Sequence, residues 1–209
     1  MKLPAIVISL ALLVAAIALS ACQQRPIEAA LSPVVKIIVG NGHGSGVSIG
    51  NGIIITAAHV VGDLSTVTLK SAAGDIQPAE VLWVSKKYDI AYLRASNPKR
   101  LGTSSLACRE PAQGETIIAK GNPLGVEFVS VWGHVAGPSR AAGPWASVMV
   151  TDITTVPGQS GGPVYDAAGM VVGITVGVMV APLGFGASLA GIGYVVPASA
   201  VCDLLARNA

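Results

Sequence analysis

Short runs of apolar and β-branched residues recur along the chain, separated by turns rich in glycine and asparagine such as Gly50-Asn51-Gly52. Runs of this composition suit the pleated, half-buried surface of a strand. The polar stretch 95–105 divides the runs into two groups. We predict twelve strands, at residues 34–39, 46–49, 53–56, 67–70, 81–84, 90–94, 116–119, 127–131, 147–151, 164–165, 170–176 and 193–196.

One helix is predicted near the C-terminal end, over residues 198–206. Pro197 suits the first turn of a helix, and Val201, Leu204 and Leu205 follow at helical spacing. Many short strands with a single short helix predict an all-β protein, either a barrel or a sandwich. The pattern of strands does not choose between these two architectures.

The N-terminus has the layout of an export signal, with a charged start at Met1-Lys2 and a nearly continuous apolar stretch at 3–19. Leu19-Ser20-Ala21-Cys22 then resembles the box of a bacterial lipoprotein signal, whose cysteine receives lipid. We predict a signal peptide at 1–21, lipidation of Cys22 and a tether at 22–31. The alternative is an uncleaved membrane anchor, because the apolar stretch is only just shorter than a bilayer requires. Both alternatives place the remaining chain outside the cytoplasm.

Composition excludes two classes of protein. Hydrophobic residues make up 52% of the chain and charged residues 11%, which is the reverse of a disordered sequence. The net charge is only +2 and no long basic run occurs, so we expect no nucleic-acid partner.

Three segments carry the side chains that a serine hydrolase needs. His59 follows the strand at 53–56, Asp89 precedes the strand at 90–94, and Ser160 lies in the glycine-rich segment 157–163. A serine hydroxyl is a weak nucleophile, so it needs a histidine base and an acid that orients the imidazole. Each residue alone has an ordinary structural explanation. Their order along the chain, however, is that of chymotrypsin-like enzymes and differs from that of subtilisins and α/β-hydrolases.

With these residues the chain resembles the trypsin-like serine proteases, and among them the protease domain of bacterial HtrA/Deg proteases. Five ordered motifs within about residues 33–206 carry the resemblance: 44–47 with 54–61, 88–93, 121–125, 157–163 and 191–197. The resemblance implies two six-stranded antiparallel β-barrels, at 32–105 and 106–209, with a short C-terminal helix. We expect no PDZ domain after them.

The resemblance also assigns roles within the candidate site. It makes His59 the general base, Asp89 its orienter and Ser160 the nucleophile, and it makes the backbone N–H groups of Gly158 and Ser160 the oxyanion hole. Two positions depart from the family pattern. Gln159 replaces an aspartate that pairs with a newly cut N-terminus, which argues against activation by cleavage. Val176 occupies the place of a hydroxyl beside the triad aspartate, with Thr175 one position away.

In this fold the pocket for the residue before the cut is lined by the segment upstream of the serine and by the strand after it. The resemblance therefore places Thr154 at the pocket base, with Ile174, Thr175 and Val176 as walls. These residues carry no charge, so a cationic substrate side chain would be buried without a partner. We predict cleavage after small or medium apolar residues. Asp152 is the one nearby acid that a shifted alignment would bring closer.

Two cysteines and two histidines remain. In an exported domain, Cys108 and Cys202 either form a disulfide or are small buried hydrophobes. Some trypsin-like enzymes tie the barrel junction to the final helix, so the resemblance favours the disulfide. His43 and His134 have no partners at metal-ligand spacing, and we predict that both are loop residues. We expect no metal and no cofactor.

The leading hypothesis is thus a serine endopeptidase that acts on protein or peptide substrates and is held in the cell envelope by the lipid on Cys22. A second hypothesis is an inactive lipoprotein that kept the protease fold and binds proteins, since fold does not fix function. A structural envelope protein is the third hypothesis, and it would not need His59, Asp89 and Ser160 together.

Overall fold

The computed structural model describes residues 31–184 and 186–207. The predicted signal peptide at 1–21, the lipidation site Cys22 and all of the tether except Leu31 lie outside the described residues. Within the described part of the chain, no helix is both long and apolar enough to cross a membrane.

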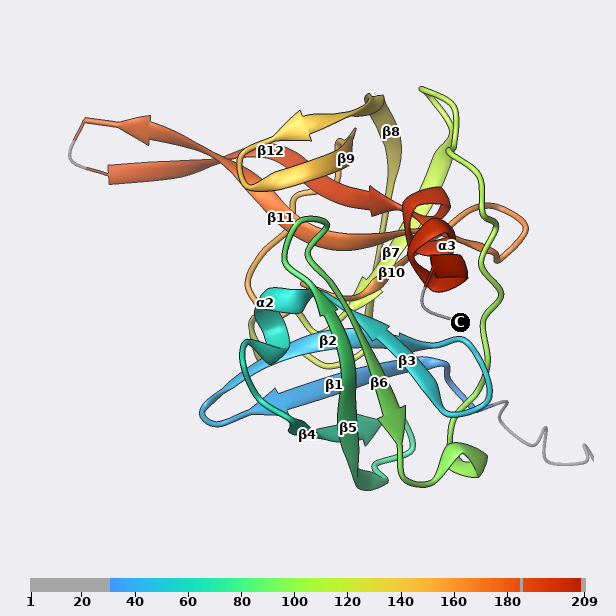
Figure 1. Cartoon of the computed structure of the whole chain (residues 1–209). Helices are drawn as coiled ribbons and strands as arrows, with labels where there is room; N and C mark the ends of the chain where they lie inside the picture. Colours follow the sequence, from blue (N-terminus) through green and yellow to red (C-terminus); the bar gives the residue numbers. More distant parts are fainter. Residues whose placement is uncertain (1–30, 185, 208–209) are drawn as a thin grey trace, which may run out of the picture. The chain divides into compact units, whose positions relative to one another are not determined.

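In the described part of the chain, twelve strands form two closed, antiparallel six-stranded barrels, which confirms the predicted all-β fold (Figure 1). The first barrel has the strand order β1-β2-β3-β6-β5-β4 and closes by pairing β1 with β4. Its strands are β1 (Val34–Val39), β2 (Gly42–Ser48), β3 (Ile53–Thr56), β4 (Thr66–Ser71), β5 (Ile76–Ser85) and β6 (Ile90–Ala95). Closure gives every strand two partners, so no sheet edge is left exposed.

The second barrel has the order β10-β11-β12-β9-β8-β7 and closes by pairing β10 with β7. Its strands are β7 (Thr116–Gly121), β8 (Val129–Ala142), β9 (Trp145–Thr151), β10 (Pro163–Tyr165), β11 (Val171–Leu183) and β12 (Gly186–Pro197). The helices α2 (Ala58–Val61) and α3 (Ala198–Arg207) and the 3₁₀ turns η1 (Pro98–Arg100) and η2 (Pro123–Gly125) complete the described elements.

Each barrel is filled by its own β-branched and aliphatic side chains, and a third cluster joins the barrels. Ile37, Ile54 and Leu93 are fully buried in the first barrel, and the second barrel buries a matching group around Ile117. The third cluster contains residues of both barrels and of α3. Burial on this joining face holds the two barrels together, and the candidate site lies between them.

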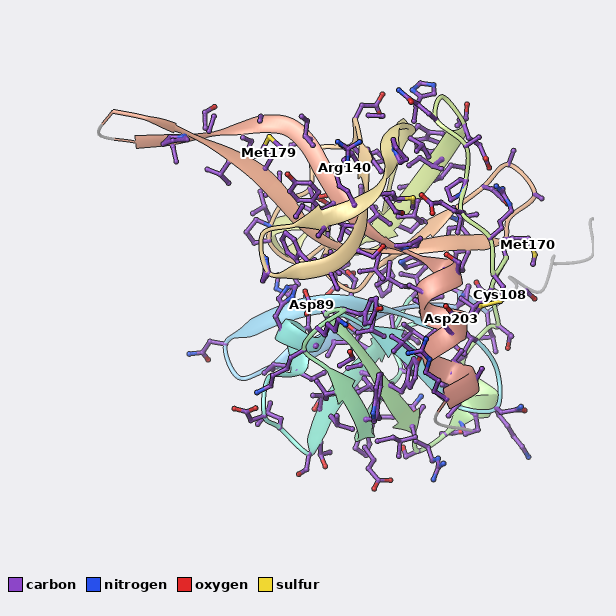
Figure 2. All side chains as sticks on the ribbon, turned by 45° about the horizontal axis from the view of Figure 1, so that its top comes forward. Asp89, Cys108, Arg140, Met170, Met179 and Asp203 are labelled. Carbon is purple, nitrogen blue, oxygen red and sulfur yellow. A yellow bond between two sulfur atoms is a disulfide. The ribbon has the colours of Figure 1, made fainter. Side chains whose placement is uncertain are left out.

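The helix α3 is tied to the rest of the molecule at two points. A disulfide joins Cys202 to Cys108, with 5.6 Å between the two Cα atoms (Figure 2). The Tyr92 hydroxyl of β6 donates a hydrogen bond to the Val201 carbonyl (3.0 Å). The C-terminal helix is therefore linked both to the segment between the barrels and to the first barrel.

The strands of the second barrel are longer than the sequence predicts. β11 continues beyond residue 176, and β12 begins before residue 193. The two extensions pair as a hairpin that projects from the barrel (Figure 1), with Val180 opposite Leu189. β8 likewise runs to Ala142 rather than ending at residue 131. These extensions are rich in glycine and alanine and lack the alternation that marks a half-buried strand, so their pattern gives no strand signal.

Candidate active site

His59 stands on α2, directly after β3 has ended. The Ala58 N–H at the start of this turn donates to the Asp89 carbonyl (3.1 Å), so the histidine turn rests on the aspartate segment. The His59 side chain is 49% exposed, whereas that of Asp89 is 11% exposed. The pair is therefore sheltered on the carboxylate side and open to solvent on the imidazole side.

Asp89 lies just before β6 in the left-handed region of backbone space, with φ at 55°. This conformation is uncommon for a residue with a side chain, and here it turns the carboxylate back toward His59. One oxygen, Oδ1, accepts the His59 backbone N–H (2.8 Å), and the other, Oδ2, lies 2.7 Å from His59 Nδ1. Figure 2 labels Asp89 at the level where the two barrels meet.

The carboxylate of Asp89 accepts a further hydrogen bond, from the indole Nε1–H of Trp145 (3.0 Å). Burial by itself raises the pKa of Asp89, but the donors on His59 and Trp145 outweigh it and hold the pKa below its usual value. An ionised carboxylate only accepts hydrogen bonds. Nδ1 of His59 therefore carries the proton, which leaves Nε2 able to accept one.

Ser160 lies in a loop between β9 and β10 whose shape depends on glycine. Gly158 and Gly161 have φ values of 95° and 84°, which residues with a side chain rarely adopt. A Cβ on Gly161 would collide with Thr56 Oγ1 and the Ser45 carbonyl. The loop is held by the Gly161 N–H, which donates to the Thr175 carbonyl (2.7 Å), and by the Ser45 N–H, which donates to the Ser160 carbonyl (2.8 Å).

Within residues 156–162, the backbone N–H groups of Gly158 and Ser160 have no acceptor among the described residues. Their neighbours are all engaged: the Gln159 N–H donates to the Val156 carbonyl (3.1 Å), and the Val156 N–H donates to Gln159 Oε1 (2.8 Å). Gln159 is buried, and its two hydrogen bonds with Val156 stabilise the loop from within. Two unpaired N–H groups beside a serine are the arrangement that stabilises an oxyanion.

A cleft of about 430 Å³ brings these groups together. His59, Gly158 and Ser160 all line it. The structure describes both His59 and Ser160, and no hydrogen bond joins them. In enzymes without substrate such hydrogen bonds are often long and tighten when substrate binds. The full lining is Val39, Gly42, His43, His59, Val60, Thr155, Val156, Pro157, Gly158, Ser160, Gly177 and Val178.

The four residues predicted to form the substrate pocket lie elsewhere in the described structure. Thr154 is exposed, Ile174 and Thr175 are buried on β11, and Val176 lines a neighbouring cleft. The cleft that contains Ser160 is lined instead by Thr155, Val156, Gly177 and Val178. For the residues of β11 the physical reason is a shift of register between Thr175 and Gly177, because a one-residue slip exchanges the two faces of a strand.

His43 and His134 are not loop residues, contrary to our prediction. His43 lies in β2, with Nε2 2.8 Å from the Asn122 carbonyl, and His134 lies in β8. The glycines around them do not interrupt the strands. Gly44, for example, allows close packing, because a Cβ there would lie 2.6 Å from the Val60 methyl groups.

Asp152 pairs with His134 outside the cleft. The carboxylate accepts the His134 backbone N–H (2.5 Å), and its second oxygen lies 3.0 Å from His134 Nδ1. This is the same two-point contact that Asp89 makes with His59, but the side chains of His134 and Asp152 are both at least half exposed. Neither residue lines a described cleft together with a serine.

Sequence reasoning missed two residues that support the site, Trp145 and Ser45. The Ser45 hydroxyl is fully buried and donates to the Gly158 carbonyl (2.7 Å). Ser45 lies in the motif at residues 44–47, and this motif was the signal that could have indicated its role. Trp145 lies 56 residues from Asp89 in a segment without any motif, and nothing in the local pattern could have indicated their contact.

The fold and this site define a protein of the trypsin-like class. Residues 44–174 match the family described as "Trypsin-like peptidase domain", and the chain belongs to this family.

The resemblance to HtrA proteases is also confirmed. Over 173 residues the chain is 31% identical to "Serine protease Do-like HtrA" of Lactobacillus helveticus, a match that covers 78% of this chain and 42% of the relative. Over 158 residues it is 30% identical to "Probable periplasmic serine endoprotease DegP-like" of Rhizobium meliloti (strain 1021), covering 74% and 31%. The chain thus spans less than half the length of either relative.

A solved structure described as "HtrA-type protease AlgW with tripeptide" shares the fold. Its TM-score is 0.74 at 24% sequence identity, and the match covers 84% of this chain and 60% of that one.

Proposed function

We propose that this chain is a serine endopeptidase in which His59, Asp89 and Ser160 form the catalytic triad. The observation that carries the proposal is the two-point contact of Asp89 with His59 at the wall of a cleft that also contains Ser160 and two unpaired N–H groups. The family supports the reaction, since its relatives here are named as serine proteases.

In the proposed reaction each group has its own role. Ser160 Oγ attacks the carbonyl carbon of the peptide bond while His59 Nε2 takes the hydroxyl proton, and Asp89 holds the imidazole and stabilises the imidazolium. The oxyanion of the tetrahedral intermediate accepts hydrogen bonds from the Gly158 and Ser160 N–H groups. His59 then protonates the leaving amine, and water hydrolyses the acyl-enzyme by the same route. Each oxyanion donor is worth about 3 kcal/mol of barrier.

The lining of the cleft supports apolar substrates. None of its residues is aspartate, glutamate, lysine or arginine, and Val156 and Val178 present β-branched side chains. A charged substrate side chain would lose its hydration there without gaining a partner. We therefore propose cleavage after small or medium apolar residues such as valine, alanine or leucine.

Cleavage of casein by the wild type and by variants tests the triad. Ser160→Ala and His59→Ala should each lower turnover by about 10⁶-fold, because members of a triad act as a unit. His134→Ala is the matched control, since it removes a histidine in the same kind of contact with an aspartate outside the cleft. Wild-type proteolysis by Ser160→Ala or His59→Ala would refute the assignment.

Labelling by a serine-reactive phosphonate separates this proposal from the second candidate, an inactive protein-binding lipoprotein of the same fold. The enzyme should be labelled at Ser160, and Ser160→Ala should remain unlabelled. Absence of labelling in the folded wild-type protein would favour the binding function.

We further propose that the protein is exported and anchored in the cell envelope through a lipid on Cys22. The sequence of residues 1–22 supports this, as does the word "periplasmic" in the name of the Rhizobium relative. Mass spectrometry of the mature N-terminus is the test. An intact segment 1–22, or an unmodified Cys22 in the mature protein, would contradict the anchor.

A further inference from the structure

Asp89 is held from both barrels. Two of the hydrogen bonds that its carboxylate accepts come from His59 in the first barrel, and the third comes from Trp145 at the start of β9 in the second barrel. Ser160 also belongs to the second barrel, in the loop after β9. The bond from Trp145 therefore links the aspartate directly to the half of the molecule that carries the serine.

We propose that Trp145 is a positioning residue of the triad, whose indole N–H fixes the orientation of the Asp89 carboxylate and through it the imidazole of His59. The inference rests on the proposed serine endopeptidase function. In this role Trp145 acts on the reaction without touching the substrate's reacting atoms.

The position that should supply a hydroxyl to Asp89 is apolar in this chain. Val176 is 2% exposed and packs in the cluster that joins the two barrels. The adjacent Thr175 is buried as well, and its backbone is engaged with the serine loop, through Gly161 and Gly162. Among the described residues, the hydrogen bonds to the Asp89 side chain come from His59 and Trp145 alone. The indole N–H thus takes the place of the missing hydroxyl.

The indole is held on two sides and along its backbone. It packs over Gly177, where an added Cβ would lie 2.8 Å from Trp145 Cζ2, and its ring centre is 5.5 Å from that of Tyr194. The next residue, Ala146, donates its N–H to the Lys87 carbonyl (3.0 Å), two residues before Asp89. Because both the ring and its backbone are fixed, the N–H is aimed at the carboxylate before any substrate arrives.

The contact acts at the oxygen that faces the imidazole. Oδ2 accepts both the His59 Nδ1–H and the Trp145 Nε1–H, so the carboxylate cannot rotate about its Cβ–Cγ bond without breaking one of them. Trp145 and His59 also line the same second cleft, of about 490 Å³, together with Asp89. A loss of the indole N–H should therefore loosen the histidine as well as the aspartate.

The test removes the indole N–H and keeps the ring. We would measure the inactivation rate with diisopropyl fluorophosphate for the wild type, Trp145→Phe and Trp132→Phe. The reagent is small and carries no peptide side chains, so changes in the cleft wall alone do not affect it. Trp132, which is 66% exposed on β8, provides the matched control. Replacement of Trp145 by β-(3-benzothienyl)alanine, which has sulfur in place of the N–H, provides a second variant of nearly unchanged shape in case Trp145→Phe does not fold.

We expect inactivation to be about tenfold slower in both Trp145 variants and unchanged in Trp132→Phe, because losing one donor to the orienting aspartate costs less than losing the aspartate itself. The NMR signal of the His59 Nδ1 proton, identified by its absence in His59→Ala, should shift or broaden in the Trp145 variants. The β-(3-benzothienyl)alanine variant keeps the packing of the ring, so a change of this signal in that variant reports the loss of the N–H and not a change of packing.

Each result has one consequence. An unchanged rate, or an unchanged Nδ1 signal, in a folded Trp145 variant overturns the inference, and so does an equal loss in Trp132→Phe. The proposed function fails separately, if wild-type protein reacts no faster than Ser160→Ala.

Discussion

Ser45 joins three segments beneath the candidate site, and its truncation gives a prediction with a magnitude. Its hydroxyl donates to the Gly158 carbonyl (2.7 Å) and accepts hydrogen bonds from the Asn122 backbone N–H (2.9 Å) and Asn122 Nδ2 (3.0 Å). Ser45 and Asn122 are fully buried. Ser45→Ala therefore leaves one acceptor and two donors without their partner in a place that water does not reach.

The cost follows from counting these lost bonds. At about 1 kcal/mol each, three lost hydrogen bonds lower the free energy of unfolding by roughly 3 kcal/mol. For a domain of this size that corresponds to a fall of about 6–12 °C in Tm. Under the proposed function, casein cleavage should also fall by about tenfold, because the Gly158 carbonyl belongs to the loop that presents the oxyanion donors, and a full donor is worth more than this.

Urea denaturation followed by circular dichroism measures the first effect. Ser65→Ala is the control, because Ser65 is exposed and its substitution removes the same atom from solvent-facing surface. A Ser45→Ala protein whose free energy of unfolding matches that of Ser65→Ala would refute the reasoning. Loss of stability with full activity would show instead that the Gly158 loop keeps its shape without this bond.

Three further predictions concern other parts of the molecule. Reduction of the Cys108–Cys202 disulfide, which closes a separation of 94 residues, should lower the free energy of unfolding by roughly 4–5 kcal/mol in the chain-entropy account; equal thiol counts with and without reductant in unfolded protein would show that the bond is absent. Burial raises the pKa of Asp166, but hydrogen bonds from Arg109 and from backbone N–H groups outweigh it and lower the pKa. The ionised Asp166 carboxylate therefore stabilises the folded protein above about pH 4, and this contribution is lost as the pH falls through the lowered pKa. Asp166→Asn should flatten the acid limb of a stability–pH curve measured in urea, and an unchanged acid limb would count against this. A peptide library varied at the cut position should favour valine, alanine or leucine, whereas strong preference for lysine or arginine would overturn the cleft assignment and implicate Asp152.

Local pattern was enough to predict where the twelve strands lie along the chain, though not their full length, and the order of the candidate site residues. β-branched runs and glycine turns are local properties, and each of the twelve predicted runs overlaps one of the twelve described strands of the two barrels. His59, Asp89 and Ser160 lie in short motifs whose residue types follow from the chemistry of acyl transfer. The closure of the barrels came from the family resemblance, because the sequence pattern alone left a sandwich open.

Contacts between distant segments were decided by the tertiary structure. Ser45 meets Gly158 across 113 residues, and Trp145 meets Asp89 across 56; neither contact leaves a periodic trace in the sequence. The lining of the cleft depended on β11, whose register shifts between Thr175 and Gly177, and it contains Gly177 and Val178 where Thr175 and Val176 were predicted. Residue types and local spacing determine which elements form and which chemistry is available. Packing determines which side chains share a face, because strand register and barrel closure are set by all the strands together.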